Sequence, residues 1–319
     1  MKNYDAILNG EKKCNYLACK KIPAYFEGHE SYGQLWKEHD AALKREEEEN
    51  VEVSLLDLKI EIAERIFREC HFCEHRCMVD RSREKGICNV GKAAIATEFL
   101  HYGEEAMLVP SHTIFFSGCN FRCVFCQNWD ISQRQRGIYI EPEKLASTIE
   151  SRNGRNVNWV GGEPTPNLPY ILQVLKHCNA NLPQIWNSNM YCSVETMKLL
   201  DGIIDLYLTD FKYGNDSCAY RLSGVKNYME VVERNHAIAY SQADMIIRHL
   251  VMPNHVECCS LPVLEWISKN APQAWVNIMD QYRPEYRAYE HAEINRVLGG
   301  NEYRKAFEYG KEMELKILR

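Results

Sequence analysis

Apolar and amphipathic segments alternate along residues 112–282, and this alternation is the feature that most constrains the fold. The pattern predicts strands at 113–116, 157–160, 184–187, 203–208, 244–251 and 274–279. It predicts helices at 142–150, 168–177, 194–200, 229–240 and 261–268. Strands that are apolar almost throughout, each followed by a helix, indicate a parallel sheet covered by helices. Six such units are too few for a closed eight-fold barrel, so we expect a partial (β/α)6 barrel, with an open flavodoxin-like sheet as the alternative.

Three cysteines follow the first predicted strand at the spacing C-x3-C-x2-C: Cys119, Cys123 and Cys126. Three thiolates on one tight loop can hold three irons of a [4Fe–4S] cube. The fourth iron then has no protein ligand and is open to a small molecule, which is typical of a catalytic site rather than a structural one. Arg122 would raise the potential of such a cluster if it pointed inward, so we expect it to point outward.

A second group of cysteines lies upstream at Cys70, Cys73, Cys77 and Cys88, a segment that we call the four-Cys block. Four cysteines among loop glycines are typical of a metal site, and four thiolates suit Zn²⁺ or an iron–sulfur centre equally well. His71 or His75 could replace one of these cysteines, and four reduced thiols without a metal are the simpler alternative. The sequence therefore indicates a second metal site without identifying its metal.

Polar residues gather where the predicted strands end, which is where β/α barrels carry their chemistry. Gly161, Gly162 and Glu163 follow the second strand, and the two glycines would let the backbone approach a ligand. The triplet Asn187-Ser188-Asn189 ends the third strand, where a simple turn cap is the alternative. Asp210 and Lys212 end the fourth strand, and their spacing of two places both on one face, as ligand-binding groups or as a structural ion pair.

Composition places the chain among globular proteins of a reducing compartment. The net charge of −6 argues weakly against a nucleic-acid-binding protein that relies on bulk positive charge, although it does not exclude a local basic groove. No apolar run approaches the length of a membrane span, and the N-terminus shows no apolar secretory core. Fourteen cysteines then point to metals rather than disulfides, and we expect a cytoplasmic location.

The cysteine loop with Gly118 before it and Phe125 within it, followed by Gly162-Glu163-Pro164, resembles the radical S-adenosylmethionine (SAM) enzymes. Within that family the chain is similar to relatives of pyruvate formate-lyase activating enzyme, over roughly residues 70–282. The resemblance implies a partial (β/α)6 barrel of the radical SAM type. It also implies a [4Fe–4S] cluster on the three loop thiolates and SAM bound at the open iron.

The resemblance further implies which residues contact SAM, and it puts Arg248 of the fifth strand among them. The adjacent His249 faces the other way and is expected to be a packed core residue. The implied SAM-binding residues are Phe125, Gly161, Gly162, Glu163, Ser188, Asn189, Asp210, Lys212 and Arg248.

The resemblance implies reductive cleavage of SAM and hydrogen abstraction from a substrate, with a glycyl radical protein as the first candidate. Another peptide, an RNA or a small metabolite is the alternative substrate. A zinc- or iron–sulfur-stabilised binding module without catalysis is the alternative of another class. The enzyme reading implies anaerobic chemistry, a reductant such as flavodoxin or ferredoxin, and no membrane partner. Nucleic acid is not favoured as a partner and is not excluded. The four-Cys block and the long N-terminus depart from the activating enzyme itself, as do Asn277, Asp280 and Gln281, which occupy the region of a His-containing segment there.

We expect four regions along the chain. Residues 1–69 form a helical extension, with helices over 31–49 and 53–69, and residues 70–105 form the four-Cys module. Residues 106–282 form the barrel. Residues 283–319 form C-terminal helices, divided by Gly299-Gly300.

Overall fold

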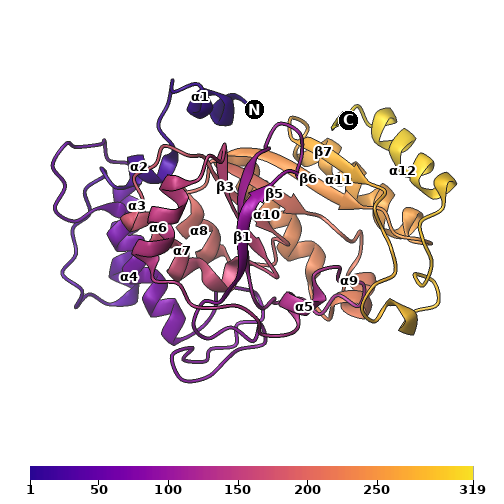
Figure 1. The fold of residues 1–319 in the computed structure, drawn as a ribbon, viewed down its shortest axis with the longest axis horizontal. Helices are drawn as coiled ribbons and strands as arrows, with labels where there is room; N and C mark the ends of the chain where they lie inside the picture. The colour runs from indigo at the N-terminus through magenta and orange to yellow at the C-terminus, as the bar shows by residue number, and fades with distance from the viewer. Residues whose placement is uncertain (319) are drawn as a thin grey trace.

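The fold was analysed in a computed structural model that describes residues 1–318. Its centre is one eight-stranded sheet in which the strands lie in chain order (Figure 1). β1 (Ile95–His101) is antiparallel to its neighbour, and the remaining strands are parallel. The other strands are β2 (Ser111–Phe116), β3 (Asn156–Gly161), β4 (Gln184–Ser188), β5 (Leu206–Asp210), β6 (Asp244–Leu250), β7 (Trp275–Met279) and β8 (Lys316–Ile317).

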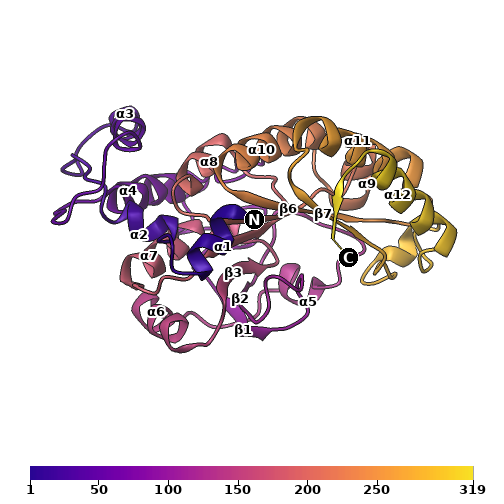
Figure 2. The ribbon, with the colours of Figure 1, turned by 90° about the horizontal axis from the view of Figure 1, so that it is seen from above.

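Helices connect the parallel strands and cover the outer side of the sheet. Right-handed crossovers that always step in the same direction place every connecting helix on one face, and the twisted sheet then curls away from them. Figure 2 shows this arrangement, with β1 and the C-terminal end at the two edges of the curved sheet. The connecting helices are α6 (Pro142–Ser151), α7 (Leu168–His177), α8 (Val194–Leu200), α9 (Asp216–Ser223), α10 (Tyr228–Gln242), α11 (Leu261–Asn270) and α12 (Gly300–Glu312). The short helix α5 (Trp129–Ser132) instead follows the cysteines after β2, and its Ser132 lines the interior cavity. The consecutive order confirms the partial barrel and differs from the flavodoxin order.

The N-terminal extension carries α1 (Lys2–Leu8), α2 (Asn15–Cys19), α3 (Tyr32–Ala42) and α4 (Leu55–Arg68). Helix α4 packs against α7, so this part of the extension lies on the outside of the barrel. The predicted helix over 31–49 is too long, because α3 ends at Ala42. A run of four glutamates follows at 46–49, and negative charge is unfavourable at the carboxyl end of a helix.

Part of the N-terminus closes the amino-end of the barrel. Tyr4 of α1 is fully buried against Leu108, from the β1–β2 connection, and against inward-facing residues of β4, β5 and β6. The Tyr4 hydroxyl accepts a hydrogen bond from Asn156 Nδ2 at 2.7 Å. This apolar layer, which we call the barrel floor, is Tyr4, Leu108, Ile185, Leu206, Leu208 and Ile246.

The C-terminal region differs from the two helices predicted there. Residues 288–290 form a single 3-10 turn, α12 follows Gly299, and the chain adds β8 to the sheet beside β7. The segment before α12 instead packs on the cysteine loop, where Arg287 N donates to Val124 O at 2.8 Å and Tyr286 stacks on Trp129. Tertiary contacts therefore replace the first predicted helix.

Two further observations concern the larger arrangement. Strand β1 belongs to the central sheet although it lies within the range 70–105, and the four-region division stays a prediction. Among the helices in the described part of the chain, none is long and apolar enough to cross a membrane.

Candidate functional site

Cys119, Cys123 and Cys126 line one cavity of about 470 Å³ inside the barrel, at the carboxyl ends of the parallel strands. The volume lies in the range of roughly 300–1,000 Å³ that is usual for small-molecule sites. Gly118 begins the loop with a φ of +89°, and a Cβ there would lie 2.3 Å from Val90 Cγ2. Only glycine fits this turn, so the residue before the first cysteine fixes how the loop leaves β2.

Each of the three sulfurs has a hydrogen-bonding partner in the chain. Phe121 N lies 3.3 Å from Cys119 Sγ, and Ser223 Oγ of α9 lies 2.9 Å from Cys123 Sγ. Ser132 Oγ lies 3.2 Å from Cys126 Sγ. Hydrogen bonds to thiolate sulfur are one of the means by which a protein sets a cluster potential.

The three thiols suit a cluster better than a single ion. Within residues 1–318, only one group of cysteine, histidine or acidic side chains brings three or more ligand atoms within 4.8 Å of one another, and these cysteines are not in it. They surround a space instead of converging on a point, as a cube requires. Burial raises the pKa of all three thiols, that of Cys123 to about 12, so bare thiolates are unfavourable there and a cationic metal centre would stabilise them.

Gly161 and Gly162 line the cavity, but the reason for glycine differs from the one expected. A Cβ on Gly161 would lie 2.1 Å from Phe116 N, and one on Gly162 would lie 2.1 Å from Gly118 O. Both missing side chains therefore face the backbone of β2 and of the cysteine loop. The two glycines fit the end of β3 against this loop, which is a reason for glycine that the sequence interpretation did not give, and their role in ligand approach stays a prediction.

Glu163 is a buried carboxylate that ties together two neighbouring strand ends. It accepts hydrogen bonds from Thr165 Oγ1 and Ser188 Oγ, both at 2.6 Å, and from Asn189 N at 3.0 Å. Burial raises its pKa, although these donors partly oppose the shift. Asn189 in turn donates from Nδ2 to Asn120 Oδ1 at 2.8 Å, so the network reaches the cysteine loop. Ser188 contributes through Glu163 and does not line the cavity.

Asp210 and Lys212 both face the cavity, as their spacing of two predicts. Their side chains form an ion pair, and the backbone N–H of Lys212 donates a hydrogen bond to the Tyr228 hydroxyl at 2.9 Å. Burial alone would lower the pKa of Lys212, but Asp210 and the nearby Cys123 raise it above its usual value. Lys212 is thus a fixed cation beside the three sulfurs.

Arg248 lines the cavity with partners that the sequence interpretation missed. Its guanidinium donates from Nε to Glu105 Oε1 at 2.8 Å and from Nη2 to Glu105 Oε2 at 2.7 Å, and it also pairs with Glu104. Asn277 Nδ2 donates to Glu105 Oε1 at 2.9 Å. Both glutamates come from the β1–β2 connection and are almost fully buried, so they form a charged layer above the barrel floor.

Phe125, Arg122 and His249 lie where the sequence predicts them. Phe125 lines the cavity. Arg122 is exposed and donates to the backbone oxygens of Cys119 and Phe121, which confirms that it points outward. His249 is fully buried between Phe211 O and Ser260 Oγ, which confirms the packed histidine. Asn187 of the predicted triplet also lines the cavity, and residues that line it without having been predicted include Gln127, Asn128, Asn277 and Gln281.

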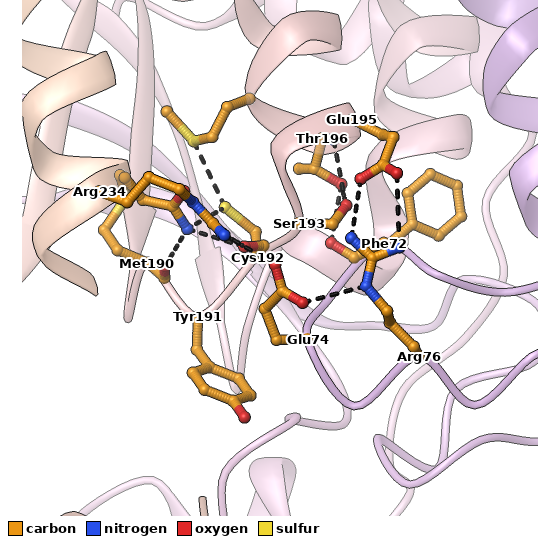
Figure 3. Close-up of polar contacts among 12 residues, drawn as sticks. Phe72, Glu74, Arg76, Met190, Tyr191, Cys192, Ser193, Glu195, Thr196 and Arg234 are labelled. Carbon is orange, nitrogen blue, oxygen red and sulfur yellow. Dashed lines mark hydrogen bonds and ion pairs between the residues drawn. The ribbon is translucent and has the colours of Figure 1, made fainter. Parts of the chain in front are cut away.

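The four-Cys block is docked on the barrel beside the cysteine loop. Figure 3 shows how ion pairs hold its first half: Arg76 lies 3.0 Å from Glu74 and 3.2 Å from Glu195, at the start of α8. Arg234 of α10 lies 2.9 Å from Glu74. Its second half contacts the loop directly, because Cys119 N donates to Cys88 O at 3.2 Å.

The two histidines of this block have partners of their own. His71 lies between Tyr32 OH, at 2.9 Å, and Glu69 O, at 2.6 Å, and His75 Nε2 lies 2.8 Å from Asn120 O. Among the described residues, no three of the four sulfurs lie within 4.8 Å of one another, as the ligands of a single ion would. Three of these thiols are buried, and that of Cys77 is half-buried.

Comparisons with known proteins agree with this site. The model of the Radical SAM superfamily matches residues 113–267, which include the cysteine loop and the first five parallel strands. The uncharacterised protein MJ0674 of Methanocaldococcus jannaschii is 50% identical over 302 residues, which cover 89% of each chain. Pyruvate formate-lyase-activating enzyme of Staphylococcus epidermidis is 24% identical over 157 residues, which cover 44% of this chain and 62% of that enzyme.

Two solved structures resemble parts of this fold. Methylornithine synthase (PylB) superposes with a TM-score of 0.47 at 14% identity and covers 99% of this chain and 78% of its own. Streptococcus suis SuiB bound to the precursor peptide SuiA has a TM-score of 0.46 at 16% identity, over 62% of this chain and 46% of its own. The family match, together with three thiols that face one cavity at the strand ends, shows that this chain is a radical SAM enzyme and belongs to the radical SAM superfamily.

Proposed function

We propose that this enzyme reductively cleaves SAM and uses the resulting 5′-deoxyadenosyl radical to take a hydrogen atom from a substrate. The observation that carries the proposal is the convergence of Cys119, Cys123 and Cys126 on a cavity whose other walls are polar strand ends. A [4Fe–4S] cluster on these thiolates would supply one electron to the sulfonium and an open iron for the amino-acid part of SAM. The S–C5′ bond then breaks to give methionine and the radical, and hydrogen transfer gives 5′-deoxyadenosine.

The protein's own residues would bind and orient SAM in this cavity. Lys212 is a buried cation that can accept a carboxylate as a second partner beside Asp210. Glu163 and Asn189 hold the ends of β3 and β4 in one network with the cysteine loop, so the walls around the ligand keep a fixed geometry. Gly161, Gly162 and Phe125 shape the wall nearest the thiols, and Arg248 with its two glutamates bounds the deeper side.

Production of 5′-deoxyadenosine tests the proposal. Anaerobically reconstituted protein, reduced with dithionite and given SAM, is expected to release it. Cys123→Ala should abolish release and lower the iron content, whereas Cys178→Ala, at a buried cysteine outside the cavity, should leave both unchanged. A fully reconstituted protein that behaves like Cys123→Ala would favour the non-catalytic binding module instead.

The first substrate candidate is a glycyl radical protein, from which a glycine Cα hydrogen would be taken. Similarity to the Staphylococcus epidermidis activating enzyme supports it, over less than two-thirds of that enzyme. Mixing the reduced protein, SAM and pyruvate formate-lyase should give the electron paramagnetic resonance signal of a glycyl radical. Release of 5′-deoxyadenosine without this signal would favour another peptide, an RNA or a small metabolite.

The four-Cys block supports a second proposal, an additional metal centre. Among the described residues no three of its sulfurs lie within 4.8 Å of one another, which favours an iron–sulfur centre over a single zinc ion. Iron should then exceed the amount for one cube and fall in Cys73→Ser. Iron for one cube only, with zinc that is lost in Cys73→Ser, would assign a structural zinc site.

The reaction also needs an electron donor. Free thiols at all fourteen cysteines are consistent with a cytoplasmic location, where flavodoxin or ferredoxin would serve. Replacing dithionite by reduced flavodoxin should sustain 5′-deoxyadenosine release.

A further inference from the structure

Four metal-binding side chains meet outside the cavity, on the outer side of the strand ends. The group is Cys218, His255, Cys258 and Cys259, whose ligand atoms all lie within 4.8 Å of one another. His255 Nδ1 lies 3.5 Å from the sulfur of Cys218, 3.4 Å from that of Cys258 and 3.7 Å from that of Cys259. The sulfur of Cys258 lies 4.0 Å from that of Cys218 and 3.9 Å from that of Cys259.

These separations are those of a tetrahedral zinc site. Zinc binds sulfur at about 2.3 Å and histidine nitrogen at about 2.0–2.1 Å, which puts neighbouring ligand atoms roughly 3.6–3.8 Å apart. We propose that Cys218, His255 Nδ1, Cys258 and Cys259 bind one Zn²⁺ ion. Four protein ligands fill the coordination shell, so the site is structural, and it is too tight for an iron–sulfur cube.

Two loops are built to bring these ligands together. Cys258 and Cys259 lie three and four residues after His255, in a π-helical turn (Val256–Ser260), and this spacing puts all three on one side of the turn. Single π-helical turns are rare in proteins, and those that do occur often lie at functional sites. Cys218 comes from the first turn of α9, which Asn215 caps through Cys218 N at 2.8 Å.

The contact between the two loops is specific. Asn215 Nδ2 donates to Cys258 O at 2.8 Å and lies 3.9 Å from Cys259 Sγ. A Cβ on Gly214 would lie 2.8 Å from the carbonyl oxygens of both cysteines, so glycine is needed for this approach. His255 Nε2 is buried, and among residues 1–318 it has no hydrogen-bond partner. The sulfurs facing Nδ1 are therefore what orients the ring.

The ion would support the cysteine loop from behind. It links the first turn of α9, which follows Lys212 along the chain, to the β6–α11 connection. At the other end of α9, Ser223 Oγ contacts Cys123 Sγ, and Arg122 N and Val124 N donate to Ser223 O and Leu222 O at 2.9 Å each. A fixed α9 thereby fixes the loop on which the proposed function depends.

Metal analysis of the full chain tests the inference without using catalysis. Protein purified anaerobically, before any iron is added, should contain about one zinc per chain that is lost in the double variant His255→Gln/Cys258→Ser. The matched variant Cys178→Ser should keep this zinc, and Cys119→Ser should keep it while losing reconstituted iron. Zinc content that is equal in wild type and the double variant, or that follows Cys73→Ser instead, would overturn the assignment.

A measurement on the wild-type chain covers the case in which the double variant fails to fold. Cys258 is exposed, so an alkylating reagent should reach it freely unless a metal holds its sulfur. Mass spectrometry should show Cys258 protected in untreated protein and alkylated after chelation, with protection restored by added Zn²⁺. Equal alkylation with and without chelator would contradict the site. Because neither measurement uses SAM, failure of the proposed function leaves this result unaffected.

Discussion

Inward-facing residues of neighbouring strands line the cavity of this molecule. The alternation of side chains along a strand, in which every second residue faces the same side, was enough to predict several of them. Asp210 and Lys212 were predicted to share a face because alternate strand residues do so, and both line the cavity. The partners of Arg248 could not be predicted in this way. Glu104 and Glu105 lie in a connection about 140 residues away, and only the curled sheet brings them to Arg248. The Cys218–Cys259 group was missed for the same reason, because its ligands are divided between two loops.

Lys212 allows a test at the scale of one side chain. Lys212→Met removes the charge and keeps the length, so the dissociation constant for SAM should rise about 10- to 150-fold, the value of one charge-assisted hydrogen bond. Equilibrium binding of SAM to reconstituted protein measures this, and iron per chain should stay at the wild-type value. Lys226→Met, at an exposed lysine, is the control. Unchanged affinity in Lys212→Met would remove Lys212 from the proposed binding site.

At the scale of elements, the long apolar strands were predictable and the short or half-exposed elements were not. Strands β2 to β7 were all found near their predicted positions, because β2 to β6 are mostly buried along their length and β7 buries Val276 and Ile278. Strand β1 was missed since its side chains are mostly only half-buried and carry no continuous apolar run. Strand β8 has two residues, and its pairing with β7 depends on the position of α12.

The contact between the end of β3 and the cysteine loop gives a prediction at this scale. Gly162→Ala would push a methyl group into Gly118 O, so the loop must shift at a cost of about 1–3 kcal/mol. Iron incorporated on reconstitution should fall, while far-ultraviolet circular dichroism stays unchanged. Gly33→Ala, where nothing lies within 4 Å of the added carbon, should incorporate iron normally. Full iron incorporation in Gly162→Ala would show that the loop tolerates the displacement.

Asp205 gives a pH-dependent prediction for the joint between α2 and the sheet. Its carboxylate accepts from Asn15 N at 2.9 Å and Gln184 N at 2.8 Å, and burial raises its pKa to about 7. With a raised pKa in the folded state, the folded chain keeps a proton on Asp205 that the unfolded chain has already lost. The contribution of Asp205 to the free energy of unfolding is therefore fully present below the unfolded pKa of about 4 and is lost as the pH rises through about 7.

The measurement compares wild type with Asp205→Asn, which cannot titrate. Between about pH 5 and about pH 7, the free energy of unfolding of wild type should fall by about 2 kcal/mol relative to the variant. Melting temperatures of the anaerobic protein across this interval report the change. Parallel pH profiles for the two proteins would contradict a raised pKa at Asp205.

At the scale of the whole molecule, the N-terminal extension is part of the barrel. Its first helix places Tyr4 in the barrel floor, and residues 102–110 supply Leu108 to the same layer. The sequence could not predict this, because a seven-residue helix far from the barrel strands carries no signal of where it docks. The cavity is thus bounded by the floor, the Arg248 charged layer and the cysteine loop.

The floor allows a prediction about global stability. Tyr4→Ala empties a fully buried site and should cost about 3–5 kcal/mol, with a clear drop in melting temperature. Tyr102→Ala, at a side chain that is 70% exposed in the neighbouring connection, should leave the melting temperature unchanged. Iron incorporation should stay normal in both variants when measured well below the melting temperature, because the cysteine loop lies at the opposite end of the strands. A melting temperature in Tyr4→Ala equal to that of wild type would show that the floor does not hold the barrel together.

The closed amino-end of the barrel also determines the order in which molecules enter and leave the cavity. Tyr4, Leu108 and the strand residues beneath the charged layer are wholly shielded from solvent, so the interior cavity is closed at this end. In a cavity closed at one end, the molecule bound deepest must enter first and leave last, because a second molecule bound nearer the opening blocks its exit. Loading and unloading of this enzyme would accordingly be ordered by depth, with the occupant nearest the Arg248 charged layer leaving only after the one nearer the carboxyl ends of the strands.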